Sequence, residues 1–68
     1  MNIRVNGEKR IIQCNKSISL NETMKLLGYS SNTVIVELNN LIINAEEWKN
    51  KYIKEGDKLE IVSIVGGG

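Results

Sequence analysis

The chain has 68 residues and a net charge of +1, from nine Lys or Arg and eight Asp or Glu, so it has room for one small domain with a thin core. It has no histidine and a single cysteine, Cys14, which argues against a Ser-His-Asp type of catalytic site, a metal site of the Cys/His type and a framework of internal disulfides. Charges of both signs are interspersed and there is neither an apolar leader nor a membrane-length apolar run, so we expect a cytoplasmic protein that binds neither nucleic acid nor membranes.

The first segment, residues 2–14, has the pattern of a β-hairpin. Asn6-Gly7 predicts its turn, because both central residues of a type I′ turn need positive φ. The return strand is expected to run to about Cys14, with Ile12 and Cys14 on one face. We interpret Cys14 as a small core residue, and a persulfide-bearing or thioester-forming thiol is the alternative.

Residues 19–28 predict a short helix. Ser19 suits the N-cap, and Glu22 stands at the position that completes a capping box. Gly28 suits the left-handed residue that ends a helix. The apolar residues of the segment recur on one helix face: Leu20, Met24 and Leu27. A helix this short needs a sheet beneath its apolar face.

A second hairpin is predicted over residues 33–44, with its turn at Asn39-Asn40, because Asn tolerates positive φ. A connector with one helical turn follows. Trp48 and Tyr52, four residues apart in this connector, are interpreted as a small cluster that closes it onto the domain, rather than as a ligand site.

The last segment, "KLEIVSIV", is nearly continuous in apolar residues, which predicts a central strand. Val62 and Ile64 should face away from Leu59 and Ile61. We expect these two outward residues, joined by Leu41 or Ile43, to form a docking patch, although scattered surface residues or burial on both faces are alternatives. The candidate patch therefore consists of Leu41, Ile43, Val62 and Ile64.

The predicted order is therefore ββαββ(turn)β, an α+β fold in which one main helix covers one face of a mixed sheet of about five strands. We place the folded domain at residues 1–65 and a C-terminal glycine tail at residues 66–68. Three extended residues reach about 10 Å, and glycine enters narrow channels that other residues cannot.

This order resembles the β-grasp, or ubiquitin-like, fold. More narrowly, "VNGEK", "VIVELNN" and "IKEGDKLEIVSIVGGG" resemble the ThiS family of sulfur carriers in thiamine (thiazole) biosynthesis. The last of the three stretches is the most specific, because it combines the strand with the terminal glycines.

The resemblance implies that an adenylating enzyme related to the ubiquitin-activating enzymes uses ATP to activate the carboxylate of Gly68. A sulfur donor such as a cysteine desulfurase then converts it into a thiocarboxylate, which thiazole synthase consumes. Gly66 and Gly67 would form the arm that enters the partner. The chain itself would be a monomeric substrate, not an enzyme, and would bind no cofactor and no metal.

Three alternatives remain open. The first is a sister carrier of the molybdopterin synthase small-subunit type, whose chemistry would be the same. The second is a protein modifier that forms isopeptide bonds through Gly68, and the third is a ubiquitin-like interaction domain without tail chemistry.

Overall fold

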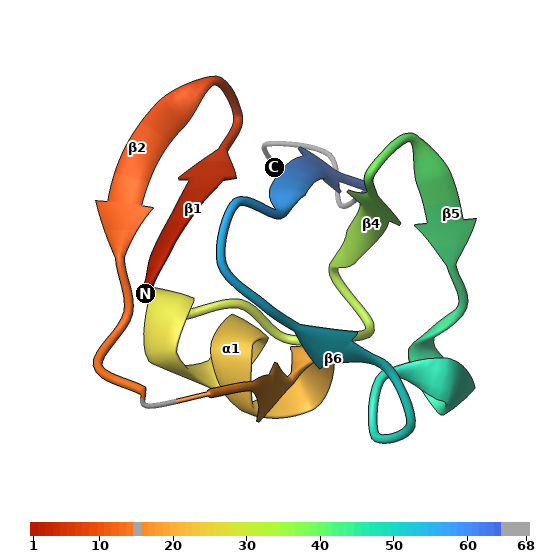
Figure 1. Cartoon of the computed structure of the whole chain (residues 1–68). Coiled ribbons are helices and arrows are strands. Elements are labelled where there is room, and N and C mark those ends of the chain that lie inside the picture. The colour runs from red at the N-terminus through yellow and green to blue at the C-terminus, as the bar shows by residue number, and fades with distance from the viewer. Residues whose placement is uncertain (15, 65–68) are drawn as a thin grey trace.

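The computed structural model describes residues 1–14 and 16–64 (Figure 1). Its elements follow the predicted order, with two additional short strands, β3 and β6. The elements are β1 (Asn2–Val5), β2 (Glu8–Ile11), β3 (Ile18–Ser19), α1 (Leu20–Leu27), β4 (Val34–Leu38), β5 (Leu41–Ile43), a 3-10 turn (Ala45–Glu47), β6 (Tyr52–Ile53) and β7 (Lys58–Ser63). The predicted tail at 66–68, and its boundary after residue 65, lie outside the described residues.

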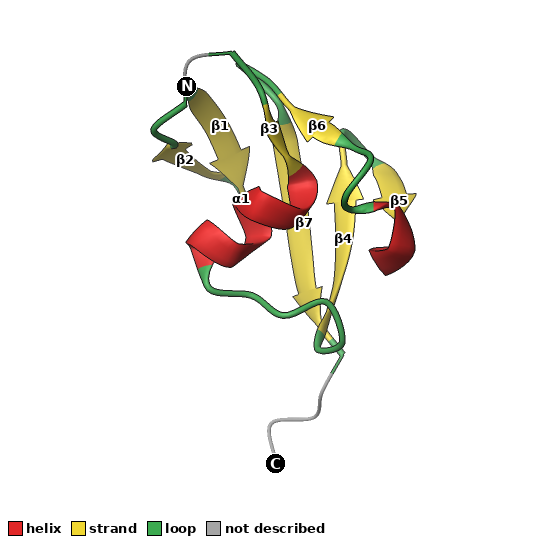
Figure 2. Ribbon diagram, turned by 90° about the horizontal axis from the view of Figure 1, so that it is seen from below, coloured by secondary structure: helices red, strands yellow, loops and turns green. Residues whose placement is uncertain are grey.

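The main sheet has five strands in the order β2-β1-β7-β4-β5, and α1 crosses one of its faces (Figure 2). The strand β7 is central, as predicted, because it pairs in parallel with β1 and antiparallel with β4. The predicted α+β class and mixed sheet are therefore confirmed. A second, two-stranded sheet joins β3 to β6.

Both hairpin turns have the backbone that their sequences predict. Asn6 and Gly7 have φ values of 52° and 84°, and Asn39 and Asn40 have values of 50° and 72°. The strand β2 ends earlier than expected, before Ile12. Even so, Ile12 stays paired, since its amide donates to the carbonyl of the first residue at 2.8 Å.

The predicted caps hold α1 at both ends. The Ser19 hydroxyl accepts a hydrogen bond from the Glu22 amide at 3.1 Å, and Gly28 adopts a φ of 88° beyond the last turn. The capping box is only half formed, because in the described part of the chain no bond joins the Glu22 side chain to the Ser19 amide. Ser19 also belongs to β3, where it lies opposite Tyr52 of β6.

A single hydrophobic core fills the space between α1 and the sheet. Leu20 and Met24 of the predicted helix face are fully buried in it, whereas Leu27 is partly buried. The buried hydrophobic residues are Ile3, Val5, Ile12, Leu20, Met24, Val34, Val36, Ile43, Trp48, Ile53, Leu59 and Ile61. Among the described residues, no helix has the length and apolar character needed to cross a membrane.

The connector before β6 corrects one prediction. Trp48 is buried in the main core, where its indole Nε1 donates to the carbonyl of Ile43 at 3.2 Å. Tyr52, however, is 59% exposed. Successive side chains of a strand point to opposite sides, so Tyr52 of β6 points away from the core in which its neighbour Ile53 is buried. Trp48 and Tyr52 therefore form no common cluster.

Candidate functional site

The strand β7 is held in the sheet up to the last described residue, Ile64. Its pairing with β4 runs from Leu59 to Ser63, and the amide of Ile64 extends it by donating to the carbonyl of Thr33 at 2.9 Å. The backbone is therefore held in the sheet as far as Ile64. The candidate tail residues Gly66, Gly67 and Gly68 themselves lie outside the described residues.

The outer face of the sheet, the face away from α1, exposes hydrophobic residues near this end. Val62 is 60% exposed and Ile64 is 54% exposed, whereas Leu59 and Ile61 are buried on the other face. Strand alternation places them as predicted. Ile35 of β4 lies directly opposite Val62 and is also exposed.

The residue that β5 contributes to the outer face differs by one position from the prediction. Ile43 is 6% exposed, because it lies opposite buried Val36 on the helix side of the sheet. Its neighbour Ile42 is 60% exposed and lies on the outer face. Leu41 is exposed as expected. Because side-chain direction alternates along β5, however, Leu41 lies on the same side of the sheet as α1, at the edge of the sheet, and not on the outer face.

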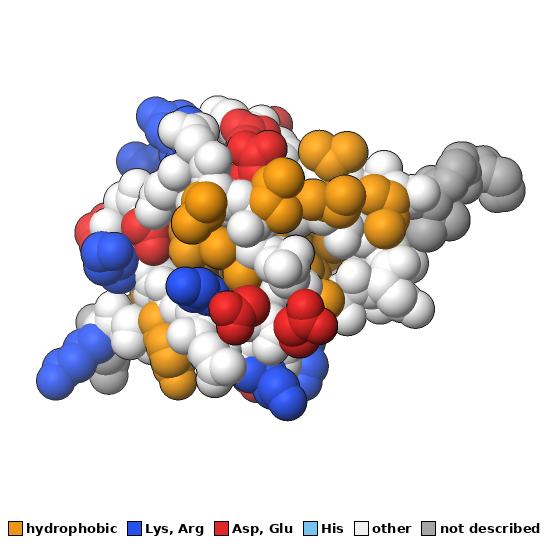
Figure 3. All heavy atoms as spheres, turned by 90° about the vertical axis from the view of Figure 1, so that its right-hand side faces the viewer, with side chains coloured by type: hydrophobic (Ala, Val, Ile, Leu, Met, Phe, Trp, Pro, Cys, Tyr) orange, Lys and Arg blue, Asp and Glu red, His pale blue; other side chains and the backbone are white. Residues whose placement is uncertain are grey.

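The apolar patch of the outer face, as we define it, consists of Ile35, Ile42, Val62 and Ile64. Hydrophobic side chains gather on the side of the molecule where β5 lies, and acidic side chains lie close to them (Figure 3). The patch includes Ile64, the last described residue, so a partner that covers the patch would contact the chain just before residues 65–68.

Charged residues divide the rest of the outer face. Glu37 of β4 and Glu60 of β7 lie directly opposite each other beside the patch. Arg4 of β1 and Lys58 of β7 lie opposite each other farther from it. The face therefore has an apolar end, an acidic middle and a basic end.

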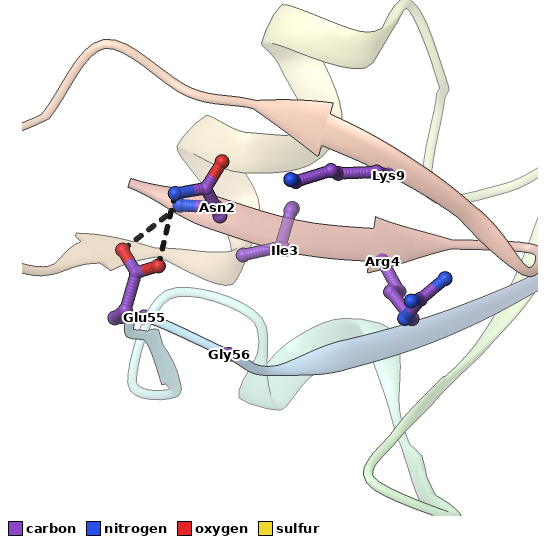
Figure 4. Close-up of a pocket in the computed structure, with 6 residues that line it drawn as sticks. All are labelled: Asn2, Ile3, Arg4, Lys9, Glu55 and Gly56. Carbon is purple, nitrogen blue, oxygen red and sulfur yellow. Dashed lines mark hydrogen bonds between the residues drawn. The ribbon is translucent and has the colours of Figure 1, made fainter.

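A shallow hollow of about 180 Å³ lies elsewhere, where β1 begins beside the turn before β7. Glu55 in this turn accepts hydrogen bonds from the backbone amide of Asn2 at 2.9 Å and from its side-chain amide at 3.1 Å (Figure 4). These bonds, helped by the N-terminal ammonium and Lys9, hold the pKa of Glu55 below its usual value. We interpret the hollow as a structural contact that ties the turn to β1.

Cys14 is partly buried against the core, and its thiol donates to the carbonyl of Ser17 at 3.1 Å. This position agrees with its interpretation as a small core residue. Within residues 1–14 and 16–64, no three His, Cys, Asp or Glu residues gather in a way that could hold a metal ion.

Comparison with known proteins identifies the family. The family model named ThiS family matches residues 3–68 of the chain, which is nearly its whole length. The chain belongs to the ThiS family. A crystal structure of the thiamine biosynthesis protein ThiS from Geobacter metallireducens is 30% identical and superposes with a TM-score of 0.85 over the full length of both chains. The β-grasp fold expected from the sequence is thereby confirmed.

Two further relatives differ in how much of their own length this chain covers. An uncharacterized protein ycf40 from Pyropia yezoensis is 38% identical over 68 residues, which make up all of this chain and 93% of that protein. A thiazole synthase from Paramagnetospirillum magneticum is 35% identical over 68 residues, but these make up only 20% of its length. A segment similar to this ThiS-family chain therefore forms part of a much longer protein.

Proposed function

We propose that the chain is a sulfur carrier of thiamine biosynthesis and that the carboxylate of Gly68 carries the sulfur. The observation behind this proposal is a central strand that leads directly to three terminal glycines in a member of the ThiS family. The chain acts as a substrate of other enzymes and needs no catalytic side chain of its own.

The proposed chemistry takes place at one carbon atom. A free carboxylate is a poor acyl donor, because it is negatively charged and has no leaving group. An adenylating enzyme lets the Gly68 carboxylate attack ATP, so that pyrophosphate leaves and an acyl-adenylate forms. A persulfide on a donor, such as a cysteine desulfurase, then displaces AMP and leaves an acyl disulfide. A second thiol attacks the S–S bond of this acyl disulfide, forms a new disulfide with the donor thiol and releases the thiocarboxylate, which supplies thiazole synthase.

The folded domain supplies the docking surface for these reactions. The apolar patch lies beside the end of β7, so a partner bound there would receive the tail in its active site. Ordering a glycine arm costs conformational entropy, and contacts made by the patch would offset this cost. Gly66 and Gly67 extend the reach of the carboxylate without side chains that would block a channel.

The test is an intact-mass measurement. The protein is incubated with ATP, the adenylating enzyme of the same organism and a sulfur donor. We expect one oxygen of the wild-type chain to be replaced by sulfur, and we expect no such product from a variant that lacks residues 66–68. Leu26→Ala, a change at an exposed helix residue on the other side of the molecule, is the matched control and should react as the wild type does.

Two outcomes would overturn the proposal. One is a truncated variant that supports thiamine synthesis in cells as well as the wild type does. The other is a wild-type chain that becomes attached to lysines of other proteins instead of gaining sulfur, because that product identifies a protein modifier.

A further inference from the structure

Two carboxylates lie side by side on the outer face of the sheet. The register of β4 and β7 places Glu37 directly opposite Glu60. Directly opposite residues of antiparallel strands have Cβ atoms about 5 Å apart, and like charges in these positions destabilise a sheet. Both side chains are partly buried, which increases the repulsion.

No cation lies within 4 Å of these carboxylates in residues 1–14 and 16–64. In the described part of the chain, the one ion pair within 4 Å joins Lys54 to Asp57, and neither Glu37 nor Glu60 has a side-chain hydrogen bond. The nearest basic residue on the outer face of β7 is Lys58, two positions before Glu60. The pair is therefore unfavourable for the isolated chain.

The surroundings of the pair make it part of a surface that can dock a partner. On β4 and β7 the neighbouring cross-strand pair on this face is Ile35 opposite Val62, and Ile42 of β5 lies opposite Glu37. All three hydrophobic side chains are exposed. A partner that covers them also takes water away from the two carboxylates, and buried carboxylates are costly unless a cation pairs with them.

The partner must therefore bring a positive charge within an apolar surface. Arginine fits best, because its planar guanidinium has five N–H donors and can bond to two carboxylates at once. A similar segment occurs inside a thiazole synthase from Paramagnetospirillum magneticum, so carrier-like and synthase sequences share one chain there. This association favours a synthase surface as the occupant.

We propose that the outer face of the sheet docks thiazole synthase by seating one arginine of the synthase between Glu37 and Glu60, with Ile35, Ile42 and Val62 packed around it. This inference rests on the proposed function. It assigns to Glu37 and Glu60 a recognition role, which accounts for a like-charge pair that lowers the stability of the free carrier.

The experiment compares the affinity of the carrier variants for thiazole synthase of the same organism, measured by titration calorimetry. Glu37→Gln and Glu60→Gln keep the size of each side chain and remove its charge. A charge-assisted hydrogen bond contributes about tenfold in affinity, so each variant should bind about tenfold more weakly than the wild type. Their binding should also depend less on salt concentration.

The matched control is Glu22→Gln, which removes the same charge from α1 on the opposite side of the sheet. It should bind with the affinity of the wild type. Thermal unfolding is measured in parallel, and both outer-face variants should unfold at the wild-type temperature or above it, because each relieves the repulsion. Weaker binding cannot then be a result of unfolding.

Four results would overturn the inference. Three concern the variants: wild-type affinity in both outer-face variants, an equal loss of affinity in Glu22→Gln, or a lower unfolding temperature in both outer-face variants. The fourth is failure of the wild type to bind the synthase. Gain of sulfur at Gly68, measured separately by mass, would still support the proposed function in each of these cases.

Discussion

Glu55 joins the turn before β7 to the first strand, through its two hydrogen bonds from Asn2. Because these bonds favour the ionised carboxyl, its pKa in the folded chain lies below the usual value of 4.5 that it regains on unfolding. The folded state therefore binds fewer protons than the unfolded state in this range. The stability that Glu55 contributes is fully present above pH 4.5 and is lost as the pH falls through the lowered pKa.

We accordingly predict that Glu55→Gln is less stable than the wild type at neutral pH and that the difference disappears in acid. The measurement is urea unfolding of both proteins over a pH series that passes through the usual carboxyl range. Two stability curves that stay parallel down to the lowest pH would contradict the role of Glu55.

At the same scale, individual residues show what the sequence could not predict. Alternation along the last strand correctly predicted that Val62 and Ile64 face outward. The short strand β5 gave no such guide, because Leu41, Ile42 and Ile43 are all apolar, so only the pairing with β4 shows that Ile42 is the outward residue. The opposition of Glu37 and Glu60 also depends on register, which a hydrophobic pattern does not specify to the exact pair.

At the scale of the elements, the helix depends on its N-cap. We predict that Ser19→Ala lowers the free energy of unfolding by about 0.5–2 kcal/mol, because the amide of Glu22 loses its acceptor. Ser19→Asp should retain most of the stability, since Asp is an equally good cap. Chemical denaturation of the three proteins measures the differences.

The control for this prediction is Ser17→Ala, two residues earlier. The hydroxyl of Ser17 takes part in no hydrogen bond within the described residues, so this change should leave the stability within about 0.5 kcal/mol of the wild type. A loss in Ser17→Ala as large as that in Ser19→Ala would mean that the cap is not the cause.

The elements that the sequence predicted well are those with local signals. Asn6-Gly7 and Asn39-Asn40 fix two turns, and Ser19 and Gly28 mark the ends of the helix. The strands β3 and β6 have no comparable signal, because each has two residues and they pair across a long stretch of chain. The exposure of Tyr52 was missed for the same reason, since it follows from the pairing of β6.

At the scale of the whole molecule, a single core joins the helix, both sheets and the connector. We predict that the protein unfolds in one cooperative transition, with a free energy of unfolding of about 3–10 kcal/mol for a chain of this length. The fluorescence of buried Trp48 and the far-ultraviolet circular dichroism of the backbone should change at the same urea concentration. An earlier change in the fluorescence would show that the connector unfolds separately.

The position of β7 also has a mechanical consequence. A force applied to the chain beyond Ile64 runs along β7, which is paired on one side with β1 and on the other with β4. Such a load shears these hydrogen bonds together, whereas a strand at the edge of a sheet could be peeled away one bond at a time. We therefore expect β7 to resist a pull along its axis better than an edge strand such as β2 would, so that the sheet moves as one body under such a load.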